Sequence, residues 1–110
     1  MLDNDEWIVV AGDAVIQKRC DSGIESLTPV ERLTYCLWVA DYSLRNAGDL
    51  ETARDLAPEF QRDAATLAAH LGLRFTQESF ALPRTSLESE YFTRFDDICR
   101  EVRSAREPGA

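Results

Sequence analysis

Long apolar segments are lacking in this sequence. No run of residues approaches the roughly 20 apolar residues that a helix needs to cross a bilayer. The first residues, Met-Leu-Asp-Asn-Asp-Glu-Trp, are acidic, whereas a secretory signal begins with basic residues. We therefore expect a cytoplasmic protein with no membrane contact.

Residues that carry common catalytic and metal chemistry are also scarce. The chain has one histidine, His70, and three widely spaced cysteines without a Cys-x-x-Cys pair. It contains no glycine-rich phosphate loop and no Gly-x-Ser-x-Gly motif. These absences argue against a metal site, a cofactor and nucleophilic catalysis, and therefore against an enzyme. We expect reduced thiols, with Cys36 and Cys99 on apolar helix faces and Cys20 at a helix end.

Basic residues are outnumbered by acidic ones, twelve against twenty, which gives a formal net charge of −8. A negative net charge repels nucleic acids and anionic lipids, so direct binding to either is disfavoured. It favours a basic protein partner. The same charge also keeps a protein soluble, and that interpretation stays open.

Strand signals are almost absent, because β-branched residues alternate with polar ones over no useful length. Helix start and stop signals are frequent instead. We predict an all-α fold, a compact single-domain bundle of five to six helices over residues 1–110 with a frayed tail at 105–110. The second and last helices are expected to form the core pair. The expected helices span residues 5–17, 29–46, 49–56, 60–71 and 77–82, with a last helix from about residue 85 to the tail.

Capping motifs set the limits of these helices. Residues 28–31, Thr-Pro-Val-Glu, combine a hydroxyl cap, a proline at the first helical position and a reciprocal glutamate. Gly48 is the expected left-handed terminator of the same helix. Residues 85–88, Thr-Ser-Leu-Glu, have the same spacing and predict a second capping box. Asp3 or Asn4 is expected to cap the first helix.

The second helix is predicted to have two apolar faces. At about 100° per residue, Tyr35, Trp38 and Tyr42 fall opposite an aliphatic stripe. One interpretation is a central helix that is packed on both sides by the first, fourth and last helices. The other leaves the aromatic face open to another chain, for example in a homodimer, because tyrosine and tryptophan anchor interfaces.

Polar residues gather at the end of this helix. Asp41 and Arg45 are spaced as an i, i+4 ion pair, which predicts a pair on the helix surface. Arg45 and Asn46 also lie where the last carbonyls of the helix need donors. The alternative is a polar pocket formed by Asp41, Tyr42, Arg45 and Asn46, with Arg45 binding an anion.

The segment LTPVERLTYCLWVADYSLRNAGDL, residues 27–50, resembles a widespread group of small uncharacterised bacterial proteins. It is also distantly similar to the DNA-mimic protein family, whose members share a helix with a tryptophan, then an acidic residue, then an Asn-rich glycine turn. The resemblance implies an all-α acidic protein whose carboxylates imitate DNA phosphates toward a DNA-binding partner.

Together these observations predict a non-enzymatic acidic interaction module that binds a protein partner, with a basic partner favoured and DNA mimicry as one form of the interaction. The binding residues would be Tyr35, Trp38, Asp41, Tyr42, Arg45 and Asn46. The alternative is a small ligand-binding protein or enzyme that uses the polar pocket at the end of the second helix.

Overall fold

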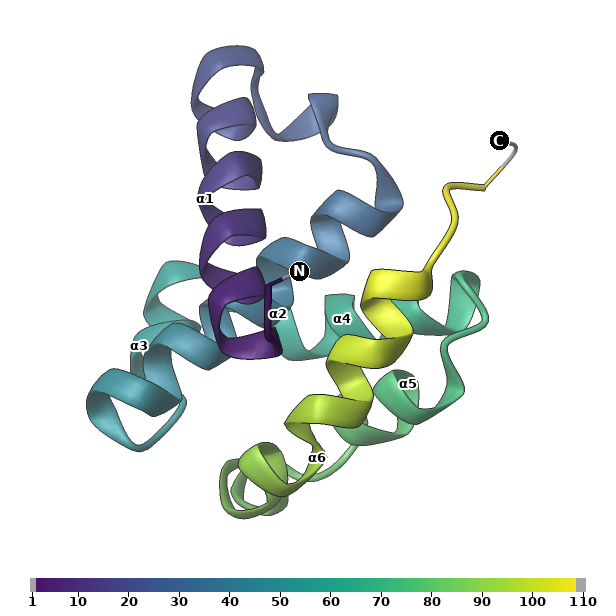
Figure 1. The fold of residues 1–110 in the computed structure, drawn as a ribbon. Coiled ribbons are helices and arrows are strands. Elements are labelled where there is room, and N and C mark those ends of the chain that lie inside the picture. The colour runs from purple at the N-terminus through teal and green to yellow at the C-terminus, as the bar shows by residue number, and fades with distance from the viewer. Residues whose placement is uncertain (1, 109–110) are drawn as a thin grey trace.

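The computed structural model describes residues 2–108 as an all-α globule, as predicted (Figure 1). Within these residues the structure has six α-helices, one short 3₁₀ helix (η1) and no strand. The elements are α1 (Asn4–Ser22), η1 (Ile24–Ser26), α2 (Pro29–Ala47), α3 (Glu51–Leu56), α4 (Phe60–His70), α5 (Arg74–Phe80) and α6 (Arg84–Ser104).

Helix α2 is the centre of the fold and packs against α1, α3, α4 and α6, which confirms that it is covered on more than one side. Its aliphatic stripe is buried, with Leu33, Leu37 and Ala40 fully inaccessible to solvent. The predicted core pair was wrong in one respect, because α4 and α1 are the main partners of α2. Helix α6 packs chiefly against α5 and meets α2 over a smaller contact.

The local capping signals of the first two helices are confirmed. The Asp3 side chain accepts a hydrogen bond from the Glu6 N–H and caps α1. At the start of α2, Thr28 and Glu31 form the reciprocal capping box, and Gly48 ends the helix in the left-handed conformation with φ 77°. Helix α1 is longer than predicted, because no residue before Gly23 interrupts it.

One predicted start and one predicted cap are wrong. Helix α5 begins at Arg74 rather than at residue 77, and Thr76 is buried inside it. Helix α6 begins at Arg84, and residues 85–88 form no capping box because no side chain caps this end. The Glu88 carboxylate instead accepts a hydrogen bond of 2.8 Å from the Leu50 N–H at the start of α3.

Carboxylates from α6 and the segment after it bind the N-terminal N–H groups of three other helices. Besides Glu88 at α3, Glu101 accepts hydrogen bonds from the Phe75 and Thr76 N–H groups at the start of α5, at 3.1 and 2.6 Å. Glu107 accepts from the Val30 N–H at the start of α2, at 3.3 Å. A helix N-terminus has N–H groups without helical partners and a partial positive charge, so a carboxylate stabilises it.

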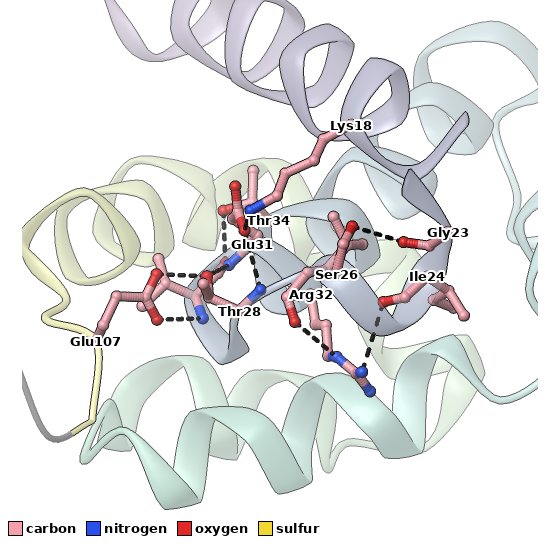
Figure 2. A network of polar contacts seen from close by, with 11 residues as sticks. Lys18, Gly23, Ile24, Ser26, Thr28, Glu31, Arg32, Thr34 and Glu107 are labelled. Carbon is pink, nitrogen blue, oxygen red and sulfur yellow. Dashed lines mark hydrogen bonds and ion pairs between the residues drawn. The ribbon is translucent and has the colours of Figure 1, made fainter. Parts of the chain in front are cut away.

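The predicted frayed tail covers residues 105–110, of which 109 and 110 lie outside the described residues. Residues 105–108 are not helical. Glu107 nevertheless reaches the start of α2, where it also accepts a hydrogen bond from the Thr28 hydroxyl (Figure 2). This contact holds residue 107 against the fold.

The three cysteines lie as predicted, with Cys20 exposed and Cys36 and Cys99 buried, and all three are free thiols. Burial raises the pKa of both the Cys36 and the Cys99 thiol to about 12. None of the helices in residues 2–108 is long and apolar enough to cross a membrane.

Replacement of Glu101 by glutamine tests the contribution of this tertiary cap. Because Glu101→Gln removes the charge and one of the oxygens that accept from α5, we expect the free energy of unfolding to fall by about 1–2 kcal/mol. The matched control is Glu78→Gln. Glu78 lies within α5, the helix that Glu101 caps, and its exposed 3.7 Å ion pair with Arg74 contributes little to stability. Urea unfolding measures both, and equal values for the two variants would contradict the capping role.

Candidate functional site

A cluster of charged and polar side chains joins α1, α2 and α6. Asp41 is only 4% exposed and accepts two hydrogen bonds of 2.7 Å, one from the Tyr91 hydroxyl and one from Arg45 Nε. The other end of the Arg45 guanidinium donates to Asp5 on α1, also at 2.7 Å. The Asp41–Arg45 ion pair was predicted, but its placement on the helix surface was wrong because the carboxylate is buried.

The environment of the cluster favours its charged form. The Arg45 guanidinium lies over the rings of Phe92 and Phe95, 5.2 Å from each centroid. Partial burial alone would lower the pKa of Arg45, but hydrogen bonds and charges from Asp41 and Asp5 outweigh it and raise that pKa. Burial raises the pKa of Tyr91 well above its ordinary value, and the Asp41 charge raises it further. Tyr91 is therefore a neutral donor to a carboxylate that is neutralised by Arg45.

This closed arrangement limits what the cluster can do chemically. Both Asp41 oxygens are engaged, and the Arg45 guanidinium already holds two carboxylates. A ligand anion at Arg45 would lie beside the carboxylates of Asp5 and Asp41, whose negative charges oppose its binding in the predicted polar pocket. Sequence reasoning missed Asp5 and Tyr91, because no pattern along the chain connects them to Asp41.

The other two residues of the predicted pocket, Tyr42 and Asn46, lie in the last turns of α2. Asn46 Nδ2 donates to the Tyr42 carbonyl at 2.7 Å, which confirms its predicted role near the last carbonyls of α2. Tyr42 itself is 43% exposed. The structure thus buries Asp41 against α6, whereas Arg45 is exposed and reaches across to Asp5 of α1, and Asn46 lies on the surface.

The aromatic face of α2 is largely covered by α1 of the same chain. The Trp38 ring stacks between those of Tyr35 and Tyr42, at centroid distances of 6.4 and 5.2 Å. Gly12 of α1 lies so close to Trp38 that a Cβ atom added there would be 2.2 Å from its Cδ1. Arg19 covers Tyr35, with its guanidinium 5.1 Å from the ring centroid. The open part of this face is therefore Tyr42.

Among the hollows on the surface of residues 2–108 are two to which the six predicted site residues contribute only Tyr35. The first, the polar hollow of about 720 Å³, lies between the start of α1 and the end of α6. Asn4 spans it by donating to Asp96 and accepting from Arg103. The second, the apolar groove of about 550 Å³, lies between the α1–α2 connection and the α3–α4 connection and is lined by Ile24, Leu27, Leu56, Phe60 and neighbouring residues.

Metal-binding residues are not gathered anywhere in the described part of the chain, residues 2–108. No group of three or more histidine, cysteine, aspartate or glutamate side chains there is placed to hold an ion. His70 is the last residue of α4 and is exposed to solvent.

Removal of the Tyr91 hydroxyl tests the buried cluster. Tyr91→Phe leaves one oxygen of a buried carboxylate without its donor, so we expect the free energy of unfolding to fall by about 1–3 kcal/mol. The matched control, Tyr42→Phe, changes an exposed tyrosine and should alter stability by less than about 0.5 kcal/mol. Denaturant unfolding at neutral pH measures both.

The same variant has a pH signature. Because the folded pKa of Tyr91 lies above that of the unfolded chain, its contribution is complete below pH 10 and is lost as the pH rises further. The phenylalanine variant lacks this alkaline loss. Identical alkaline slopes for the two proteins would contradict the assignment.

Insertion of a methyl group at Gly12 tests whether α1 covers the aromatic face. Gly12→Ala forces a contact with Trp38 whose overpacking costs about 1–3 kcal/mol, more than the gain of up to about 1 kcal/mol in helix propensity. We expect net destabilisation and a shift in tryptophan fluorescence. Asp13→Ala, at the next and exposed position, is the control. A stabilised Gly12→Ala protein would show that α1 does not lie against Trp38.

Comparison with known proteins assigns no function to this cluster or to the apolar groove. No protein-family model matches the chain, and neither a curated protein nor a solved structure matches it. The candidate sites therefore depend on the geometry above. They are the closed Asp5–Arg45–Asp41–Tyr91 cluster and the two hollows.

Proposed function

We propose that the protein is a non-enzymatic acidic module that binds a partner protein with a basic surface. The observation that carries this proposal is the outer face of α1, which consists of Glu6, Val9, Val10, Asp13 and Gln17. Val9 and Val10 are 52% and 54% exposed, although valine is a residue type that folded proteins usually bury.

The charges beside these valines lack partners within the fold. Among residues 2–108, no basic side chain lies within ion-pair distance of Glu6 or Asp13. Both carboxylates are exposed, and the opposite side of α1, with Ile8, Gly12 and Val15, is buried. An exposed apolar pair beside free carboxylates suits a partner that offers apolar side chains among lysines or arginines.

A basic partner is favoured over a second copy of this chain. Two copies that met through the outer face of α1 would bring Glu6 and Asp13 of both chains together, and juxtaposed like charges oppose association. The same charges attract a basic surface and accelerate its encounter. A homodimer through this face would therefore bind more weakly than a basic protein.

DNA mimicry is a narrower form of the same proposal. Duplex DNA carries one charge per about 1.7 Å of its axis. Helix α1 has four acidic residues over its 19 residues, which corresponds to one per roughly 7 Å at 1.5 Å rise per residue. This spacing supports a general acidic docking surface more strongly than a close copy of a duplex.

The alternative is a ligand-binding protein or enzyme that uses Asp41, Tyr42, Arg45 and Asn46. It requires an anion to bind Arg45 beside Asp5 and Asp41, which Arg45 already holds at 2.7 Å and whose negative charges repel an anion. A basic partner at the outer face of α1 meets no such repulsion, and this difference is the reason for our preference.

Capture of a basic protein by the immobilised chain tests the proposal. We expect capture at low salt and release at high salt, because opposite surface charges are screened as ionic strength rises. The double variant Glu6→Gln with Asp13→Asn should lose most of the captured protein.

The matched control, Glu78→Gln with Asp97→Asn, removes the same charge from exposed positions on α5 and α6 and should retain the partner. Equal capture by both double variants would overturn the role of α1. Absence of any captured basic protein at low salt would overturn the proposed function.

A further inference from the structure

The apolar groove is a second surface, separate from the outer face of α1. Its volume of about 550 Å³ falls in the range typical of binding pockets, roughly 300–1,000 Å³. One wall comes from the end of α1, η1 and the first turns of α2, and the other from the α3–α4 connection and α4. These segments are distant in sequence.

Apolar side chains form the groove and remain open to solvent at its rim. Leu27 and Phe60 are buried at 5% and 2% exposure, whereas Ile24 and Leu56 are 49% and 48% exposed. An occupant that covered Ile24 and Leu56 would remove this apolar surface from water, which is the main favourable term in association.

The charges of the two walls have opposite sign. Arg19 and Arg32 line the wall formed by α1 and α2, and Glu59 and Asp63 line the wall formed by α4. Among residues 2–108, neither arginine has a carboxylate within ion-pair distance, although the chain has eight more acidic than basic residues. On the other wall, Glu59 forms an exposed ion pair of 3.4 Å with Arg62, and Asp63 has no such pair among residues 2–108. The groove therefore has a cationic edge and an anionic edge.

Contacts within the chain already hold both arginines in place. Arg32 donates to the carbonyls of Leu27 and Ile24, at 3.2 and 3.5 Å, and so ties η1 to α2 (Figure 2). Arg19 donates to the Tyr35 hydroxyl at 3.1 Å and lies over its ring. A guanidinium has five N–H donors, so each arginine keeps donors for a carboxylate of an occupant.

The one thiol in the groove is unsuited to covalent chemistry. Burial raises the pKa of Cys36 to about 12, with a further contribution from the Asp63 charge. The thiolate is the reactive form of cysteine, so Cys36 stays protonated and inert near neutral pH. The side chains of the groove therefore suit non-covalent binding rather than covalent chemistry.

We propose that the apolar groove docks an amphipathic segment of a partner protein, with a row of apolar side chains, carboxylates along one edge and bases along the other. The carboxylates pair with Arg19 and Arg32, and the bases pair with Glu59 and Asp63. This inference rests on the proposed function only in that the chain binds protein, and it assigns a different surface and a different partner chemistry.

The charge pattern selects this occupant over two others. A uniformly basic segment would meet repulsion at Arg19 and Arg32, and a uniformly acidic one would meet it at Glu59 and Asp63. An apolar row in a groove is the recurring mode by which an amphipathic helix docks on a protein. A segment with mixed edges satisfies both walls at once.

Titration of the isotope-labelled full chain with designed helical peptides tests the proposal. One peptide has a leucine row with glutamates on one edge and lysines on the other, and the second has the same leucine row with lysines on both edges. At physiological salt we expect the mixed-edge peptide to shift the amide resonances of Ile24, Leu27 and Leu67 and to bind about tenfold tighter than the lysine peptide.

Peptide binding is also compared between variants of the groove and a control variant outside it. Ile24→Ser with Leu56→Ser should weaken binding of the mixed-edge peptide by about tenfold or more, and Arg19→Gln by a smaller factor. Leu2→Ser is the control, since Leu2 is also an exposed apolar residue but lies outside both the groove and the outer face of α1. All substituted side chains are exposed, and circular dichroism checks that each variant is folded.

Two results would overturn the inference. One is equal or tighter binding of the lysine peptide, which would show general attraction to an acidic protein. The other is unchanged or absent binding of the mixed-edge peptide across wild type and groove variants. Either result leaves the salt-dependent capture through Glu6 and Asp13 to be judged separately, so failure of the groove and failure of the proposed function are distinguishable.

Discussion

The fold depends on carboxylates of α6 and of the segment after it, which accept hydrogen bonds from the N-terminal N–H groups of other helices. Glu88 and Glu101 of α6, and Glu107 just after it, bind the starts of α3, α5 and α2. Helices α3 and α5 have only six and seven residues. No flanking side chain caps α5, and the one local side-chain bond at the start of α3 runs from the Glu51 N–H to Asp49. Helices this short are marginal in isolation, so contacts from α6 must supply what local sequence does not.

This arrangement changes the meaning of the acidic composition. A formal charge of −8 suggests a surface for binding cations, but part of the acidic set serves inside the molecule. Asp41 is buried against Tyr91 and Arg45, and Glu101 binds the start of α5. The carboxylates that remain for a partner are those without internal contacts, and Glu6, Asp13 and Asp63 are among them. The distribution of charge therefore says more about binding than its total.

Patterns of neighbouring residues predicted those features of the fold that depend only on residues close in sequence. The all-α class, the capping box of α2 and its end at Gly48 follow from residues adjacent in sequence, and all are confirmed. The start of α5 and the capping box of α6 were wrong because Thr76 and Glu88 have the residue types of local caps but bind groups on other helices. A spacing rule cannot distinguish these two uses of the same side chain.

In the candidate sites too, contacts between residues close in sequence could be predicted, and contacts between distant segments could not. The pairing of Asp41 with Arg45 follows from their i, i+4 spacing, whereas their contacts with Asp5 and Tyr91 cross 40 and 50 residues of sequence. The apolar groove was not foreseen, because its walls come from segments that meet only in the folded chain.

The capping carboxylates also impose an order on assembly during translation. Glu88, Glu101 and Glu107 all follow, in the chain, the helices whose starts they bind. Domains are synthesised from the N-terminus, so α2, α3 and α5 emerge before these three carboxylates. The nascent chain must therefore hold these helices with incomplete termini until α6 arrives. In this protein α6 and the segment after it complete the ends of helices made earlier.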